Sequence, residues 1–194
     1  LGQKARLVVR DQPDQAIGLL RRQATTLEGR EEAREFVADQ ILLGRLLLYR
    51  GQPQSVLTLL QEIEAVCPFE QARLEIQIGY QTLRAQSELM LERYSEAARC
   101  LDFLEDLQRS DRLPSESSQG EVLSLQLSLY VSRPELVGDE SAARAYARLD
   151  QLMEGLDRTL HIPVHEERDQ WGWELSRLRF ETARLSAEVA RERL

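Results

Sequence analysis

The chain has 194 residues and a formal net charge of −8, and 42% of its residues are hydrophobic. Glycine and proline are few, whereas leucine, arginine, glutamine, glutamate and alanine dominate, a composition that favours helix throughout and suffices for one sizeable core. The negative charge, with no basic run, argues against direct contact with nucleic acid, and the lack of a signal peptide or of an apolar run of about 18 residues argues against a membrane segment.

Two residue types say more about the chain's chemistry. Every basic residue except Lys4 is arginine, which suits bidentate contacts with carboxylates and phosphates; a coding bias toward G and C is the favoured alternative. The two cysteines, Cys67 and Cys100, have apolar neighbours and form no close-spaced pair. We expect two buried, reduced thiols in a cytoplasmic protein. Because the chain begins at Leu1 and ends within a helical pattern, we also expect a fragment of a longer protein.

The N-terminal residues predict the end of one helix and then a second one. Asp11 and Pro13 break an apolar patch, since proline is tolerated only in the first helical turn. Residues 14–28 then place their apolar side chains on one face, and Gly29 supplies the end. This second helix would belong to a hairpin whose first helix comes earlier.

Residues 31–68 predict a helical hairpin. A helix over residues 31–50, apolar on nearly every side, ends at Gly51, and a second helix starts at Pro53. The spacing resembles a tetratricopeptide repeat, with a small residue, Gly44, at the eighth position. The residues that carry this resemblance are Leu43, Gly44, Leu47, Gly51, Val56, Leu60, Ile63 and Pro68. The repeat is degenerate, because Gln40 replaces the usual aromatic and Val56 the usual alanine.

The next hairpin is predicted over residues 69–110. Its turn, at residues 92–97, resembles the Gly-Arg-Tyr-x-Glu-Ala turn of such repeats, with Glu92 in place of glycine. Ala16, Val56 and Ala97 stand at equivalent positions, 40 and 41 residues apart. This spacing exceeds the period of the standard repeat, which is about 34 residues, so we expect longer helices.

The C-terminal part predicts three further helices. Residues 110–120 form an exposed serine-rich loop, 121–132 a short helix and 133–138 an extended turn, after which Asp139 is the N-cap of a helix to about residue 158. Residues 160–166 form a loop, and one long helix follows from Asp169. Its apolar stripe predicts packing on the previous hairpin, with a coiled-coil seam as the alternative.

These elements predict an all-α fold, a right-handed superhelix of degenerate tetratricopeptide-like hairpins with about nine helices. We expect a single domain. Its repeat units would be residues 1–30, 31–68, 69–110, 119–159 and 166–194.

No catalytic constellation is evident. His161 and His165 have the spacing of two metal ligands on a helix, but Pro163 lies between them and no third ligand is in evidence. Two solvated loop histidines are therefore the favoured reading. No phosphate-binding glycine loop or nucleophile elbow occurs, so we expect no enzyme, no cofactor and no metal.

The resemblance to tetratricopeptide repeats implies a concave groove lined by the first helix of each hairpin. Transferred to this chain, the predicted binding residues are Ile41, Arg45, Leu48, Tyr49, Gln86, Met90 and Trp171. A groove with apolar walls and polar anchors suits a protein or peptide partner or a small molecule. Two alternatives stay open: longer helices would bury these side chains, and Trp171 and Trp173 would be packing residues.

Residues 42–110 are also similar to the helical-repeat region of MalT-like regulators, the large ATP-dependent members of the LuxR family. The similarity rests on leucine and alanine spacing in LLLYRGQPQSVLTLLQEIEA and ERYSEAARCLDFLEDL. It implies a domain that binds an inducer or an inhibitory protein and signals to a nucleotide-binding domain before it and a helix-turn-helix after it. The alternative is a scaffold or adaptor that holds partners and senses nothing.

Overall fold

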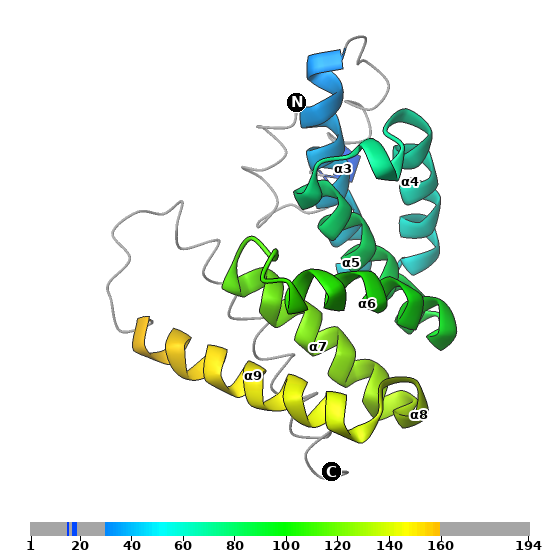
Figure 1. Cartoon of the computed structure of the whole chain (residues 1–194). Coiled ribbons are helices and arrows are strands. Elements are labelled where there is room, and N and C mark those ends of the chain that lie inside the picture. Colours follow the sequence, from blue (N-terminus) through cyan, green and yellow to red (C-terminus); the bar gives the residue numbers. More distant parts are fainter. Residues whose placement is uncertain (1–14, 16, 19–29, 160–194) are drawn as a thin grey trace. The chain divides into compact units, whose positions relative to one another are not determined.

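The computed structural model describes residue 15, residues 17 and 18, and residues 30–159 (Figure 1). Within that part the chain forms helices and no strands, which confirms the all-α class. The predicted helix at 14–28 is described only in part, and the loop at 160–166 and the helix from Asp169 lie outside the described residues. The elements are α3 (Arg30–Tyr49), α4 (Pro53–Val66), η1 (Phe69–Gln71), α5 (Leu74–Met90), α6 (Tyr94–Arg109), α7 (Glu116–Ser132), α8 (Pro134–Val137) and α9 (Asp139–Thr159).

The chain divides into two compact units, with the boundary between Glu92 and Arg93. The first unit contains α3, α4, η1 and α5, and the second contains α6 to α9. This boundary falls inside the hairpin predicted over residues 69–110. The single superhelix and the count of about nine helices stay predictions.

The first unit begins with the predicted hairpin of α3 and α4. Gly51 has a φ of 68°, and the amides of Gly51 and Gln52 donate to the carbonyls of Leu48 and Leu47 at 2.8 and 2.9 Å. This pair of bonds satisfies carbonyls at the end of α3, and only glycine adopts such a φ without steric cost. Pro53 then starts α4, where its missing amide hydrogen would be unpaired anyway.

The core of this unit lies among α3, α4 and α5, which all contact one another (Figure 1). A Cβ atom on Gly44 would lie 2.7 Å from Leu83 Cδ1, and one on Gly79 would lie 3.1 Å from Ile41 Cγ2. Gly44 is therefore a helix-contact position. The repeat spacing predicts a close approach to α4, but the nearest side chain is Leu83 of α5, and Leu59 of α4 is 3.7 Å away. Because residue numbers in the two contacts rise together, α3 and α5 run in the same direction.

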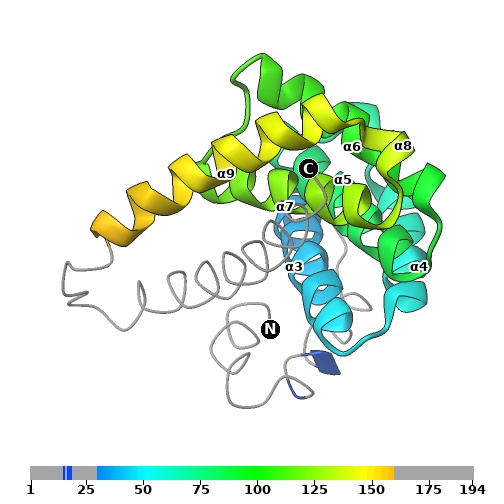
Figure 2. The ribbon, with the colours of Figure 1, turned by 90° about the horizontal axis from the view of Figure 1, so that it is seen from below.

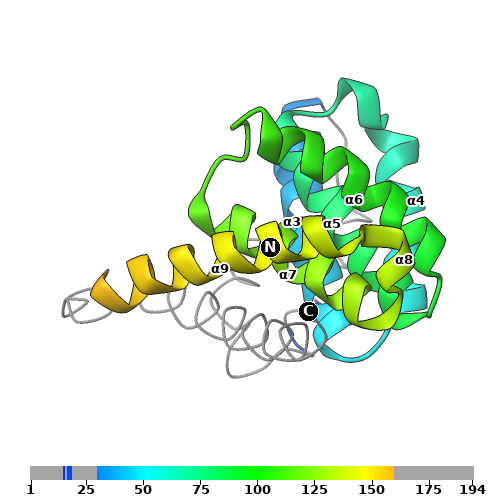
Figure 3. The same cartoon turned by 60° about the horizontal axis from the view of Figure 1, so that its bottom comes forward.

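The second unit is built around α7, which contacts α6, α8 and α9. Figures 2 and 3 both show α9 running beside α7, with the short α8 connecting them at one end. The core of α7 and α9 consists of Leu123, Leu127, Tyr130, Ala142, Ala145, Leu149 and Leu152. Their spacing of three and four residues along each helix places them on one face.

Three predictions in this unit are corrected. The loop predicted to Gly120 ends earlier, because Ser115 caps α7 by accepting from the Ser118 amide at 3.2 Å, so the helix starts at Glu116. The turn predicted at 133–138 contains α8. Asp139 is the first residue of α9, not its N-cap, and its carboxylate accepts from the Tyr130 hydroxyl at 2.8 Å.

The two cysteines were both predicted to be buried, but only one of them is. Neither Cys67 nor Cys100 forms a disulfide; Cys100 is buried, whereas Cys67 is only half-buried. Among the described helices, none has the length and apolarity needed to cross a membrane.

Candidate functional site

The structure places the predicted groove residues of α3 and α5 at very different depths. Leu48 is 7% exposed and belongs to the core, and Ile41 packs against that core beside Gly79. Tyr49 is 79% exposed and Met90 46% exposed. Arg45 and Gln86 are half-buried, and Trp171 lies outside the described residues. Burial of Leu48 is what the packing alternative predicts, whereas Tyr49 and Met90 are accessible to a partner.

Tyr49 and Met90 lie at the same end of the first unit. The contacts of Gly44 with Leu83 fix the register of the two parallel helices. From those residues, Tyr49 is about 7.5 Å and Met90 about 10.5 Å further along its helix, at a rise of about 1.5 Å per residue. Only one further large hydrophobic residue is recorded as exposed in the described part, Leu136 on α8. The first unit therefore presents an aromatic and a thioether side chain at one end.

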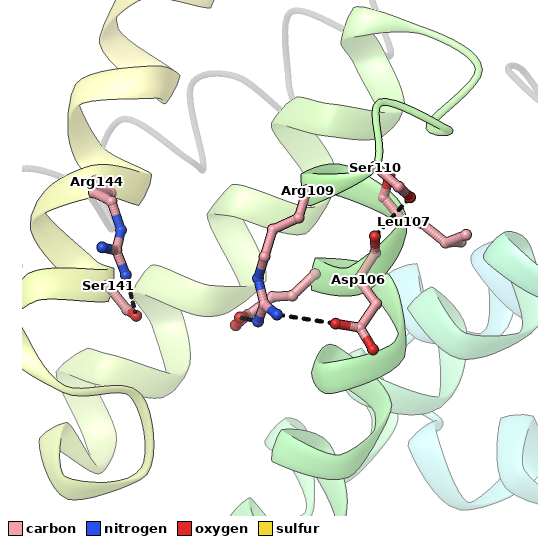
Figure 4. Close-up of polar contacts among 7 residues, drawn as sticks. Asp106, Leu107, Arg109, Ser110, Ser141 and Arg144 are labelled. Carbon is pink, nitrogen blue, oxygen red and sulfur yellow. Dashed lines mark hydrogen bonds and ion pairs between the residues drawn. The ribbon is translucent and has the colours of Figure 1, made fainter.

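A second candidate site lies within the second unit. Side chains of α6, α7 and α9 enclose a groove of about 420 Å³. The groove is lined by Glu105, Gln108, Arg109, Leu123, Gln126, Ser141, Arg144, Ala145 and Arg148. Figure 4 shows α9 with Arg144 on one side and α6 with Arg109 on the other.

Helical periodicity brings these residues together. On α9 the lining residues Ser141, Arg144 and Arg148 are three and four residues apart, and on α6 Glu105 and Arg109 are four apart. Residues at these spacings share one helix face. The groove thus has an apolar floor on α7 and α9 and a polar, mostly basic rim.

Arg109 is held by acidic neighbours on its own helix. Its guanidinium donates to Glu105 at 2.9 Å and to Asp106 at 3.0 Å (Figure 4). The hydrogen bond with Glu105 raises the pKa of Arg109 above its ordinary value, and the charges of Glu105, Asp106 and Asp102 act in the same direction. Arg109 is therefore a permanent cation on the rim.

The two arginines of α9 differ in their partners. Arg144 donates to Glu140 at 2.7 Å and to the Ser141 hydroxyl at 3.2 Å. Arg148 donates to the side-chain oxygens of Gln119 and Gln151 at 3.2 and 3.3 Å. Within the described part of the chain, the recorded partners of Arg148 are thus neutral amides.

The floor of the groove contains one polar side chain, Gln126 of α7. It is 6% exposed, and Leu123 and Ala145, which line the same groove, are 2% and 4% exposed. Its Oε1 atom is buried and has no hydrogen-bond partner among the described residues. Buried polar groups are normally hydrogen-bonded, so a lone buried acceptor beside a groove indicates a place where a donor can bind.

This groove was not predicted from the sequence. Arginine is suited to carboxylates and phosphates, but no arginine of α6 or α9 was predicted to bind a ligand. The local signal is the pair Arg144 and Arg148 four residues apart, together with Gln126 inside the apolar run of α7. Neither feature says which helices face each other.

Comparison of the chain with protein-family models, with curated proteins and with solved structures returned no match. Among the described residues, no cluster of three or more histidine, cysteine, aspartate or glutamate side chains is arranged to hold a metal ion. His161 and His165 lie outside that part. The second unit offers cationic hydrogen-bond donors and an apolar floor, and the first unit separately presents an exposed aromatic residue; each is a feature of binding sites.

Proposed function

We propose that this chain is a non-enzymatic helical binding module whose partner is a protein or peptide. The observation that carries the proposal is Tyr49, 79% exposed at the end of α3 with Met90 at the same end of α5. Aromatic residues at interfaces often carry much of the binding energy, because they bury a large area and lose little conformational entropy. Met90 adds a flexible, polarizable side chain suited to adaptable contacts.

The packing of α3 supports a role in binding for Tyr49. The other large residues near the end of this helix, Leu46, Leu47 and Leu48, are 8%, 3% and 7% exposed and pack in the core. Tyr49 follows directly but adds nothing to that core. A substitution at Tyr49 therefore separates binding from folding.

Within this proposal, the chain is the partner-sensing domain of a MalT-like regulator, which binds an inducer or inhibitory protein. The similarity of residues 42–110 to that family supports this reading. The alternative is a scaffold or adaptor. A thermal-shift screen of metabolites on the purified chain separates them: a metabolite that raises the unfolding midpoint without a protein partner supports the sensor, whereas a stoichiometric protein partner with no metabolite response supports the adaptor.

The binding proposal is tested by capture from a lysate with three forms of the chain. The forms are the wild type, the double variant Tyr49→Ser/Met90→Ser, and the control Leu136→Ser, which removes an exposed hydrophobic residue from the other unit. We expect a protein that the wild type and the control retain and the double variant loses. Equal retention by all three forms, or the absence of any retained protein, would refute the assignment to Tyr49 and Met90.

A further inference from the structure

We propose that the groove between α6, α7 and α9 binds an acidic peptide segment, whose carboxylates contact Arg109, Arg144 and Arg148. This inference rests on the proposed function, because it names the chemistry of a partner that a binding module would take. It assigns that partner to the second unit, independently of Tyr49 and Met90. The groove holds a short stretch of peptide, since its volume is about 420 Å³.

The first argument is charge. The groove lining contains three arginines and one glutamate, a net charge of +2 in a chain whose net charge is −8. Guanidinium groups bind carboxylates through two parallel hydrogen bonds, which gives both strength and orientation. The carboxylates that pair with these arginines, Glu105, Asp106 and Glu140, balance this charge, so an acidic ligand binds by displacing them.

The second argument is that the existing partners of these arginines are easily exchanged. The side chains of Arg109 and Arg144 are 69% and 67% exposed, and their pairs with Asp106 and Glu140 lie at the surface, whereas Glu105, the other partner of Arg109, is 21% exposed. Exposed pairs of this kind contribute little net stability. Arg148 donates only to amide oxygens in its recorded contacts, so a carboxylate would give it a stronger acceptor.

The third argument is Gln126. Its buried Oε1 accepts no hydrogen bond from the described residues, so a ligand that supplies an N–H group would satisfy it. Because that oxygen is itself closed to solvent, the ligand reaches it only after a lining side chain turns aside.

These three features together favour a peptide over a phosphate. A phosphate dianion would satisfy the arginines, but it supplies at most one O–H donor for Gln126 and no carbon atoms for the apolar floor. A peptide with aspartate or glutamate carries carboxylates for the arginines and backbone N–H groups for the glutamine. Its aliphatic carbons would lie on Leu123 and Ala145, which form the apolar floor.

The test uses fluorescence anisotropy with the full chain and a short, capped, fluorescein-labelled oligoglutamate. Oligoglutamine of the same length is the uncharged control. The test variant is Arg144→Gln/Arg148→Gln, and the matched control is Arg99→Gln. Arg99 is an equally exposed arginine of α6 in a surface pair with Glu96, and it is not among the lining residues.

We expect oligoglutamate to bind the wild type and the Arg99→Gln variant alike, and the double variant about tenfold or more weakly, because charge-assisted contacts are lost. Oligoglutamine should bind weakly to all three. Replacing both α9 arginines with glutamate should reverse the preference toward an oligolysine. Each variant is checked for folding by circular dichroism. Surface substitutions of this kind are expected to preserve the fold.

Several outcomes would overturn the inference. One is that oligoglutamate fails to bind the wild type; another is that the Arg99→Gln change weakens binding as much as the double variant. Binding of inorganic phosphate to the wild type, measured by isothermal titration calorimetry, with no binding of oligoglutamate would assign the groove to phosphate instead. None of these results affects the outcome of the capture experiment, in which the test variant changes only Tyr49 and Met90. Each proposal can therefore be refuted without refuting the other.

Discussion

Substitution of Gly44 is the most sensitive test of the packing of the first unit. A Cβ atom at this position would lie 2.7 Å from Leu83 Cδ1, whereas carbon atoms pack at about 3.5 to 4.0 Å. Leu83 is 1% exposed, so its methyl groups cannot move into solvent. Gly44→Leu should therefore overpack the contact between α3 and α5.

The expected magnitude combines two opposing effects. Overpacking costs about 1 to 3 kcal/mol, and four added carbons place Gly44→Leu near the upper end of that range. Replacing glycine inside a helix returns about 1 kcal/mol through higher helix propensity. We expect a net loss of about 2 kcal/mol in the free energy of unfolding, measured by urea denaturation with far-UV circular dichroism.

A double-mutant cycle with Leu83 identifies the cause. Leu83→Ala alone should destabilise by about 2 to 5 kcal/mol through a cavity. In the double variant, the leucine at position 44 would fill the space left by the Leu83 side chain. Its loss in the free energy of unfolding should therefore be smaller than the sum of the two single losses, by about 1 kcal/mol or more. Gly18→Leu is the control, because a Cβ atom there meets nothing within 4 Å. Additive effects, or an unchanged midpoint for Gly44→Leu, would refute the contact.

Three further substitutions test other parts of the structure. Gln126→Met removes a buried acceptor that has no partner among the described residues. It should leave the free energy of unfolding unchanged or raise it by about 1 to 3 kcal/mol, and it should weaken oligoglutamate binding. A lower free energy of unfolding would show that the oxygen accepts a hydrogen bond in the native protein. Glu92→Gly should raise the free energy of unfolding by about 1 kcal/mol, because Glu92 has a φ of 58°, which glycine adopts without steric cost. The control Arg93→Gly, at a φ of −92°, should not raise it. Tyr130→Phe should lower the free energy of unfolding by about 1 to 2 kcal/mol through loss of the 2.8 Å bond to Asp139, and a change below about 0.3 kcal/mol would contradict that bond.

Helix boundaries followed from the sequence where a residue has a strong backbone preference. Gly51 and Pro53 predict the turn of the first hairpin, and the resemblance to a glycine-containing turn at Glu92 agrees with its positive φ. The start of α7 was wrong, because a serine-rich stretch reads as a loop unless Ser115 is recognised as a cap. The prediction for Asp139 was wrong in the opposite way: aspartate is a common N-cap, but here it is the first residue of α9 and its carboxylate accepts from Tyr130.

The binding surfaces were predictable only in part. Tyr49 and Met90 are exposed, as residues facing a groove would be, but Leu48 from the same predicted set is buried. The repeat spacing alone does not predict which of these residues are exposed, because burial depends on how far each neighbouring helix extends. The arginine-lined groove was not predicted, because its arginines come from two helices far apart in the sequence: Arg109 and Arg144 are 35 positions apart. Only the packing of α7 against both α6 and α9 brings them together.

The comparison of captured proteins is the most direct test of the claim that this chain is a binding module. The wild type and the Leu136→Ser control are predicted to retain the same protein at the same stoichiometry, and the Tyr49→Ser/Met90→Ser variant is predicted to lose it while unfolding at the same urea concentration. Retention of that protein by the double variant would contradict the account, and so would a chain that retains nothing.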